Sequence, residues 1–321
     1  MKAAYINQYG GPENIIIGEL PDPVPSKDQV LIRIMACSVN PVDWKVREGR
    51  LKFLSGKKFP LIVGSEISGI IEAVGPGAGD FKPGDRVFAG LSHKGGGSAE
   101  LVAVNKGNVS RIAAGLGFAD ASTMAIAGMT PMQAFTLHYK VRPGDEVLVN
   151  GASGGVGMYA VQIAKILGAR VTAVCSSRNA DFVRELGADE VIDYNAEDFR
   201  KRSDAFHVIL DAASNAFLPD VKNCLKKGGM LIKLNLSFKS LFLGFWTRYF
   251  ADRKLKMILV KNRREDLQWL MDQIIQGKIK IHTEKTYSLD QVREAHEYSE
   301  TGRVRGKLVV VMQSAWGGRS A

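Results

Sequence analysis

The most informative chemistry in this chain lies in a glycine-rich turn at residues 150–157, which reads Asn-Gly-Ala-Ser-Gly-Gly-Val-Gly. Gly151, Gly154 and Gly157 recur at three-residue spacing between an apolar run and a helix-like stretch. Glycine at such positions permits a tight turn and lets backbone N–H groups at a helix start approach a pyrophosphate. The pattern therefore predicts a nicotinamide-dinucleotide site, with contacts from Ala152, Ser153, Gly154, Gly155, Val156 and Gly157.

The residues after the next predicted strand indicate which dinucleotide binds. About 20 residues beyond the glycine turn, NAD-binding chains typically present an acid to the adenosine ribose. This chain has Cys-Ser-Ser-Arg-Asn at 175–179, and hydroxyl and guanidinium groups suit a 2′-phosphate. We therefore expect NADPH rather than NADH, held by Ser176, Ser177 and Arg178, with Tyr194 flanking the adenine or reaching the phosphate. The alternative is that the serines and the arginine only cap the next helix.

The elements around this turn alternate between strands and helices, which predicts a doubly wound parallel sheet. Residues 1–120 instead show short apolar segments between glycine and proline turns, which is typical of a compact β-barrel. We expect an α/β protein with a β-rich domain at 1–120 and 262–321 and a Rossmann domain at 121–261. The predicted strands are 30–39, 62–74, 86–89, 146–149, 170–174, 190–193, 207–210, 230–234 and 307–312; the helices are 121–139, 156–167, 180–186, 218–225 and 265–276, with a disordered tail at 314–321.

Composition places the chain among soluble globular proteins. It has 321 residues, 45% hydrophobic and 24% charged, which suits about two domains. Its three cysteines, Cys37, Cys175 and Cys224, are widely separated, so neither a disulfide framework nor a thiolate zinc site is indicated. No apolar run reaches the ~18 residues that span a bilayer, and from the composition of the first residues we expect no targeting signal. We expect a cytoplasmic protein, at most peripheral to a membrane.

The net charge of +10 is concentrated in residues 222–264, where twelve Lys and Arg stand against the single acid Asp252. Within this segment, residues 238–257 interleave aromatic side chains with the cations. Such a stretch can lie on an anionic membrane surface. The alternative is a loop and helix that line the substrate pocket or a dimer contact. The chain shows no recognisable nucleic-acid-binding module, so we expect no specific nucleic acid partner.

Several motifs together resemble the zinc-free quinone oxidoreductase branch of the medium-chain dehydrogenase/reductase superfamily, with its ζ-crystallin, chloroplast-envelope quinone oxidoreductase and alkenal/enone reductase members. The resemblance covers nearly all of residues 1–312 and implies a GroES-like catalytic domain, a Rossmann domain and often a homodimer. The motifs are Asn40-Pro41-Val42-Asp43-Trp44-Lys45, Gly64-Ser65-Glu66, 81–87, 151–157, 186–189 and 302–309.

The chain departs from the zinc-dependent branch of that superfamily at the metal ligands. Those enzymes place a cysteine near the Asn40 position and a Gly-His-Glu triplet where this chain has Gly64-Ser65-Glu66. Cys37 precedes Asn40 by three residues and so would not occupy the ligand position, and His93 is a lone imidazole in a glycine-rich loop. We therefore expect no catalytic metal.

Without a Lewis acid, a hydride acceptor must spread the developing negative charge within itself, as quinones and α,β-unsaturated carbonyls do. We expect Asn40 to donate to the nicotinamide or the acceptor oxygen, and Lys45 to bind the cofactor ribose or stabilise the oxyanion. Asn40 as a turn residue and Lys45 as a solvated lysine are the alternatives. The resemblance places Thr130 by the nicotinamide, although a helix-cap hydroxyl before Pro131 is the simpler reading. Lys307 either approaches the cofactor or only closes the last strand.

Two hypotheses of function follow. The favoured one is an NADPH-dependent, zinc-independent oxidoreductase that transfers a hydride to a quinone or to the activated double bond of an enal or enone. Quinone carbonyl reduction and alkene reduction use the same hydride geometry and stay open. The alternative is a non-catalytic NADPH-binding protein that associates with an anionic membrane or RNA through the basic segment 222–264.

Overall fold

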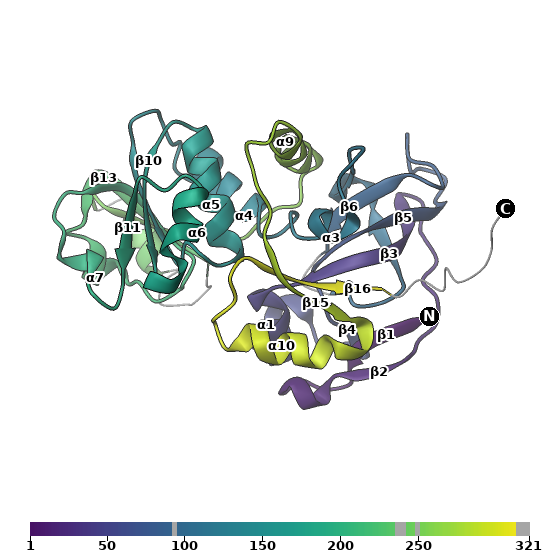
Figure 1. Cartoon of the computed structure of the whole chain (residues 1–321). Helices are drawn as coiled ribbons and strands as arrows, with labels where there is room; N and C mark the ends of the chain where they lie inside the picture. The colour runs from purple at the N-terminus through teal and green to yellow at the C-terminus, as the bar shows by residue number, and fades with distance from the viewer. Residues whose placement is uncertain (92–94, 235–241, 248–250, 313–321) are drawn as a thin grey trace. The chain divides into compact units, whose positions relative to one another are not determined.

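The computed structural model describes residues 1–91, 95–234, 242–247 and 251–312. The chain forms two compact units (Figure 1). The first unit contains Met1–Ile126, Asn262–Ile275 and Ile281–Ala321, and the second contains Ala127–Lys261 and Gln276–Lys280. The predicted tail at 314–321 lies outside the described residues, and so does His93.

The first unit is β-rich. Its described residues form a seven-stranded sheet of order β15-β16-β3-β5-β6-β8, with β7 also paired to β3, and a three-stranded sheet of order β2-β1-β4. Only β15 and β16 pair parallel among these strands as described. The strands are β1 Lys2–Ile6, β2 Ile16–Glu19, β3 Gln29–Val39, β4 Leu61–Ile62, β5 Glu66–Val74, β6 Arg86–Gly90, β7 Leu101–Asn105, β8 Val109–Arg111, β15 Thr283–Ser288 and β16 Lys307–Val311.

Short helices cover this sheet. Helix α10 packs on α1, β16 and β3, while α3 packs on β3 and β5, and α9 on β8. The helices of this unit are α1 Pro41–Arg47, α2 Lys52–Ser55, α3 Phe118–Ala121, α9 Arg264–Ile275 and α10 Val292–Glu300, with 3-10 turns η1 Pro12–Asn14, η2 Lys106–Asn108 and η6 Leu289–Gln291.

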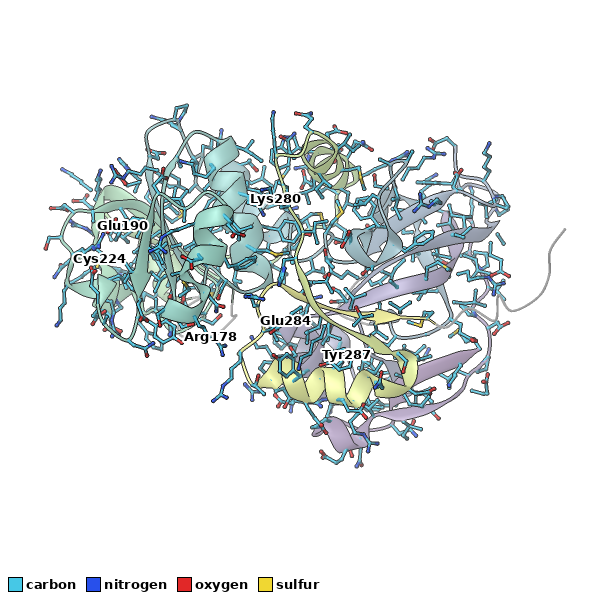
Figure 2. All side chains as sticks on the ribbon, in the orientation of Figure 1. Arg178, Glu190, Cys224, Lys280, Glu284 and Tyr287 are labelled. Carbon is cyan, nitrogen blue, oxygen red and sulfur yellow. The ribbon has the colours of Figure 1, made fainter. Side chains whose placement is uncertain are left out.

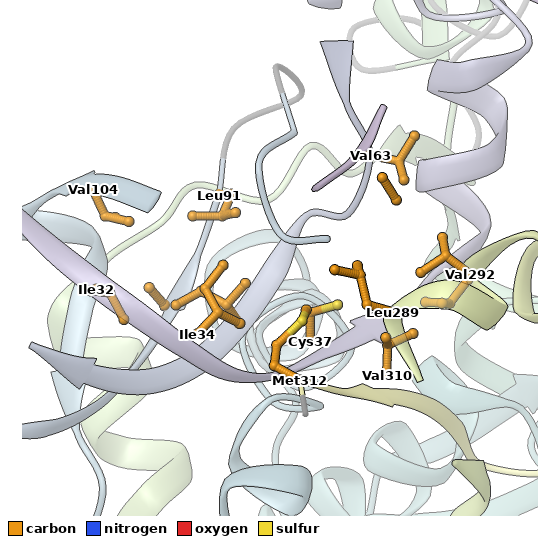
Figure 3. Close-up of a cluster of buried hydrophobic side chains, with 14 of the residues drawn as sticks. Ile32, Ile34, Cys37, Val63, Leu91, Val104, Leu289, Val292, Val310 and Met312 are labelled. Atoms are coloured by element: carbon orange, nitrogen blue, oxygen red, sulfur yellow. The ribbon is translucent and has the colours of Figure 1, made fainter. Parts of the chain in front are cut away.

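The core of the first unit is built by alternation along β3. Ile32 and Ile34 point inward at two-residue spacing, as the period of a strand requires. They pack in one cluster with Val310 of β16, Leu289 of η6 and Val292 of α10 (Figure 3). This apolar cluster fixes the register of β3 against its neighbours, because a one-residue slip would turn the inward side chains to the other face.

The second unit contains the predicted parallel sheet. Its described strands have the order β11-β10-β9-β12-β13-β14, all parallel, which confirms the doubly wound prediction. Helix α5 packs on β9 and β10, and α6 on β11. The elements are α4 Met129–Gln133, the π-helix η3 Ala134–His138, β9 Glu146–Asn150, α5 Gly155–Ile166, β10 Arg170–Cys175, η4 Ser177–Asn179, α6 Ala180–Glu185, β11 Glu190–Asp193, η5 Phe199–Lys201, β12 Phe206–Asp211, α7 Leu218–Val221, β13 Leu225–Lys233, β14 Lys254–Met257 and a helix at 242–247.

Three predicted elements need correction. The single helix predicted at 121–139 is interrupted by turns at 122–128, because the Ile126 N–H within them is drawn to the Glu66 carboxylate. The strand predicted at 62–74 is split at Gly64, whose φ of +94° belongs to the left-handed region. The helix predicted at 218–225 ends at Val221, and strand β13 already begins at Leu225.

The three cysteines are free and buried. Burial raises the pKa of the Cys37 thiol to about 12 and that of the Cys175 thiol to about 11, and it also raises the pKa of Cys224. All three are therefore protonated thiols at neutral pH. Within the described residues, no helix combines the length and apolar character that crossing a bilayer requires.

Candidate functional site

A fully buried carboxylate, that of Glu66 at the start of β5, organises the polar residues of the first unit. Its Oε1 accepts hydrogen bonds from Lys307 Nζ at 2.7 Å, from Asn40 Nδ2 at 2.8 Å and from the Ser38 hydroxyl. Its Oε2 accepts from the Ile126 backbone N–H at 2.6 Å. The Lys307 ammonium, itself buried, neutralises the carboxylate, so the charge of the pair is compensated inside the protein.

Strand pairing brings these residues together from distant parts of the sequence. Leu308 of β16 pairs with Val39 of β3 in antiparallel register, which sets Lys307 beside Asn40, the next residue after β3. Lys307 Nζ donates to Asn40 Oδ1 at 2.6 Å. Asn40 is also the N-cap of α1, and Pro41 at the first helical position fixes the turn.

The amide of Asn40 is engaged by the protein on both sides. Its Nδ2 donates to Glu66 and approaches the Ser38 hydroxyl at 3.4 Å, while its Oδ1 accepts from Lys307. In this arrangement Asn40 orients Lys307 and Glu66. The predicted donation from Asn40 to a nicotinamide or acceptor oxygen stays a prediction, and it requires that one of these contacts be exchanged.

Asp43 caps the first turn of α1 from the inside. Its Oδ2 accepts from the Asn40 backbone N–H at 2.7 Å, and the side chain is buried. Burial raises the pKa of Asp43 to about 7, and the negative charge of Glu66 adds to the rise. The Ser65 hydroxyl, the Asn40 N–H and Lys307 offset it in part. Asp43 therefore titrates near neutrality.

Lys45 lies on the same helix but faces a different environment. Its Nζ is 5.2 Å from the centroid of the Trp44 ring, and the side chain is half-buried. Burial lowers the pKa of Lys45, and the nearby Arg50 lowers it further. A half-desolvated ammonium is a stronger hydrogen-bond donor to an anion than a solvated one, so the predicted oxyanion role of Lys45 remains chemically reasonable.

The donor set around Glu66 does not fit a zinc ion. An ammonium, from Lys307, stands beside Glu66 and Asn40, and Cys37 carries a protonated, buried thiol 3.7 Å from the Ser98 hydroxyl. In the part of the chain that the structure describes, no three His, Cys, Asp or Glu side chains are grouped as metal ligands. A lysine ammonium supplies positive charge and hydrogen-bond donors but no open coordination position.

The glycine turn of the second unit has the geometry that a pyrophosphate requires. Gly151 has a φ of +81°, and a Cβ on Gly157 would lie 2.1 Å from the Gly151 carbonyl oxygen, so only glycine fits. Helix α5 begins at Gly155 with Gly154 as N-cap, and no side chain caps its first N–H groups. A Cβ on Gly154 would have only the Gly151 carbonyl oxygen nearby, at 3.6 Å. These uncapped N–H groups suit the diphosphate of a dinucleotide.

The predicted adenosine-side residues gather at the carboxyl ends of β10 and β11. Ser177 and Arg178 are exposed on η4, Ser176 precedes them, and Tyr194 is exposed directly after β11 (Figure 2 labels Arg178). Sequence reasoning missed Asn179, whose buried Nδ2 donates to Ser153 Oγ at 3.0 Å and approaches Ser176 Oγ at 3.4 Å. Asn179 thus ties the glycine turn to the segment that we expect to bind the 2′-phosphate.

The remaining predicted residues lie in different units. Thr130 is buried on α4 of the second unit, whereas Lys307, Asn40 and Lys45 belong to the first. Their approach to a nicotinamide stays a prediction. Glu66 was part of a recognised motif but not of the predicted site. A carboxylate directly before the apolar residues that begin β5 is the signal that could have identified it.

Comparison with known proteins agrees with this architecture. Residues 26–130 match the family model of the alcohol dehydrogenase GroES-like domain, and residues 186–310 match that of zinc-binding dehydrogenases. The chain is 36% identical to the chloroplastic quinone-oxidoreductase QR1 of Triphysaria versicolor, over 97% of this chain and 98% of the relative. It is 29% identical to the chloroplastic NADPH-dependent alkenal/one oxidoreductase of Arabidopsis thaliana, over 97% and 79%. The quinone oxidoreductase structure from Coxiella burnetii superposes with a TM-score of 0.86 at 29% identity, over 97% and 99%.

A GroES-like domain joined to a Rossmann domain defines the medium-chain dehydrogenase/reductase fold, which confirms the predicted fold class. Within that superfamily the chain belongs to the quinone oxidoreductase and alkenal reductase branch.

The pair of Glu66 and Lys307 gives a stability prediction. Lys307→Met should leave the carboxylate buried without its cation and lower the free energy of unfolding by about 3–5 kcal/mol. Glu66→Gln should lower the free energy of unfolding by a comparable amount. The double variant should lower it by clearly less than the sum of the two single changes. Urea unfolding of the four proteins measures this coupling.

The exposed pair of Arg33 and Glu72 is the matched control, because it joins β3 to β5 at 2.6 Å in the same sheet. Its double-mutant cycle should give a coupling energy of less than about 1 kcal/mol. A coupling energy for the buried pair no larger than this value would contradict the prediction.

Asp43 gives a pH prediction. Because its pKa is about 7 in the folded protein and 3.8 as a free group, the native state binds the proton more tightly. The stability from this proton is fully present below about pH 3.8 and is lost as pH rises through about 7. Asp43→Asn keeps the acceptor for the Asn40 N–H but removes the titration, so the variant should gain stability relative to the wild type as pH rises from 4.5 to 8. Unfolding curves across this range test it; a pH-independent difference would contradict it.

Proposed function

We propose that this protein is an NADPH-dependent, zinc-independent oxidoreductase that reduces quinones or the activated double bond of α,β-unsaturated carbonyls. The observation that carries the proposal is the buried Lys307–Glu66–Asn40 group, in which a lysine and not a metal supplies the cation. The names of the relatives, quinone oxidoreductase and NADPH-dependent alkenal/one oxidoreductase, support the same reaction class. The proposal includes a catalytic domain at 1–120 and 262–321 and a cofactor domain at 121–261.

The residues of the second unit bind and orient the cofactor. The N–H groups at the start of α5 receive the pyrophosphate, and Ser176, Ser177 and Arg178 receive the 2′-phosphate. When bound, the nicotinamide supplies a hydride to the acceptor.

The residues of the first unit supply hydrogen bonds to the developing negative charge. Asn40 is the N-cap of α1 and Lys45 lies in its last turn. Lys45 can donate to the remote oxygen of a conjugated acceptor, and Asn40 can do so once it gives up one of its present contacts. Conjugation is needed because no Lewis acid polarises an isolated carbonyl here. A simple saturated ketone is therefore expected to be a poor substrate, whereas quinones and enals are expected to be turned over.

The test is turnover with NADPH against a panel of quinones, enals, enones and saturated ketones. We expect measurable turnover of conjugated acceptors, at least about tenfold slower reduction of saturated ketones, and a preference for NADPH over NADH. Arg178→Ala should weaken NADPH binding by about tenfold to a hundredfold, the value of one or two charge-assisted hydrogen bonds, and should leave NADH almost unaffected.

Arg184→Ala is the matched control, since Arg184 is an exposed arginine of the following helix that pairs with Asp181 at 2.8 Å. This variant should change the affinity for neither NADPH nor NADH. Binding of NADPH without turnover of any conjugated acceptor would overturn the enzymatic proposal and favour the non-catalytic alternative.

We also propose a peripheral contact between the second unit and anionic membranes. Phe242 is 74% exposed on the helix at 242–247, and Phe245 and Trp246 beside it are exposed as well. The Thr247 hydroxyl accepts from the Leu255 N–H at 3.1 Å, which holds this helix against β14 and its exposed Lys254 and Lys256. Aromatic side chains beside cations suit a lipid headgroup surface. Phe238, Lys239, Arg248, Tyr249 and Phe250 of the predicted segment lie outside the described residues.

Sedimentation with vesicles tests this contact. Binding to vesicles with anionic lipid should exceed binding to neutral vesicles, weaken with added salt, and fall when Lys254 and Lys256 are both replaced by Glu. Equal binding to both kinds of vesicle, or none, would contradict it. A dimer that dissociates in the Phe242→Ser variant would instead show that the aromatic face joins two copies of the chain, and salt-sensitive binding to RNA alone would favour the nucleic-acid alternative.

A further inference from the structure

A buried polar network lies at the carboxyl edge of the six-stranded sheet, next to the glycine turn. Asn150, Asp211 and Lys233 end β9, β12 and β13, and the parallel register pairs Asp211 with Asn150 on one side and with Lys233 on the other. Asp211 is 0% exposed and Lys233 is 4% exposed. Burying a charge of each sign costs several kcal/mol before the pair interacts, so its position requires a physical account.

The contacts of this pair converge on the loop that follows β12. Asp211 Oδ2 accepts from the Ala216 N–H at 2.9 Å and lies 3.7 Å from Lys233 Nζ. The Lys233 ammonium donates to the Ala216 carbonyl oxygen and lies 4.5 Å from the centroid of the Phe217 ring. The peptide groups of Ala216 are thus bound on both sides by the ion pair.

The other end of the same loop is fastened to the glycine turn. The N–H groups of Ala212 and Ala213 donate to the Asn150 carbonyl oxygen at 2.9 and 3.0 Å. Asn150 Nδ2 donates to Asp211 Oδ1 at 2.8 Å and to Asn215 Oδ1 at 2.7 Å. The contact between the two segments is so close that a Cβ on Gly151 would lie 2.9 Å from the Ala213 nitrogen.

The position of the loop at 212–217 relative to the sheet indicates which half of a dinucleotide lies beside it. The strand order reverses between β9 and β12, and open α/β sheets bind their ligands outside the carboxyl ends of the strands at such a point. The adenosine-side residues follow β10, on one side of β9, whereas the loop at 212–217 follows β12, on the other. The second nucleotide of a dinucleotide whose diphosphate lies on the glycine turn must therefore extend over this loop.

In a doubly wound dinucleotide-binding domain, each side of the switch point binds one nucleotide. We propose that Asp211 and Lys233 are positioning residues that fix the backbone of the loop at 212–217 for the nicotinamide half of the cofactor. This inference rests on the proposed function. The pair acts through Ala216 and does not contact the reacting atoms. Ser214, whose φ of +61° is uncommon for a residue with a side chain, lies at the middle of the loop, consistent with a backbone shaped by its fastening at both ends.

Binding of the whole cofactor and of its two halves separates a positioning role from a merely structural one. Calorimetry is performed on the full-length protein with NADPH, with 2′,5′-ADP as the adenosine half, and with reduced nicotinamide mononucleotide as the other half. Lys233→Met should weaken the binding of NADPH about tenfold or more and weaken the binding of the mononucleotide in parallel. The affinity for 2′,5′-ADP should change less than about twofold. Lys227→Met, an exposed lysine on the same strand, is the matched control and should change none of the three.

Asn215→Ala keeps the test decisive if Lys233→Met does not fold, because Asn215 fastens the same loop from its own side chain without belonging to the buried ion pair. It should show the same selective loss. The double variant Asp211→Asn with Lys233→Met should recover stability relative to Lys233→Met alone but should not recover NADPH affinity.

An equal loss of all three ligands in the folded variants, or unchanged NADPH affinity, would overturn the inference while leaving the proposed function intact. Arg178→Ala provides the opposite pattern, with 2′,5′-ADP weakened and the mononucleotide unchanged. Failure of the wild-type protein to bind either NADPH or 2′,5′-ADP would instead overturn the proposed function, and the inference with it.

Discussion

The need to neutralise one buried carboxylate shapes the first unit of this protein. Glu66 is fully buried at the start of β5, where an isolated charge would be strongly unfavourable, and four donors from three segments of the chain satisfy it. Two of these donors are the side chains of Asn40 and Lys307, and a third is the backbone N–H of Ile126, in the turns between α3 and α4. The turns at 122–128 that interrupt the predicted helix and the orientation of the candidate catalytic residues thus have the same electrostatic cause.

The second unit also contains a buried carboxylate that a buried lysine neutralises. There the buried pair is Asp211 and Lys233, and it stabilises a loop instead of a strand junction. In both units an ammonium and a carboxylate neutralise each other and also form hydrogen bonds with amide groups. In both units the backbone that the pair holds is part of a proposed ligand-binding site. Buried ion pairs are weak evidence for stability but can specify one conformation among several.

Sequence patterns predicted what depends on local periodicity and on glycine. The parallel sheet, the glycine turn and the family all followed from patterns of residues close together in the chain. The partners of Glu66 did not, because Lys307 reaches it only through the pairing of β16 with β3, 241 positions away in sequence. Asn179 and the Asp211–Lys233 pair were missed for the same reason. Strand register decides which polar side chains share a buried space, and composition does not reveal register.

The location of the sulfur atoms has a consequence for an enzyme that handles Michael acceptors. Quinones and enals alkylate cysteine through its thiolate form. Here Cys37, Cys175 and Cys224 are buried, and burial raises the pKa of each thiol, so that each sulfur is shielded and keeps its proton. A protein arranged in this way offers its own substrates no competing nucleophile among its cysteines, and so resists covalent self-inactivation during turnover.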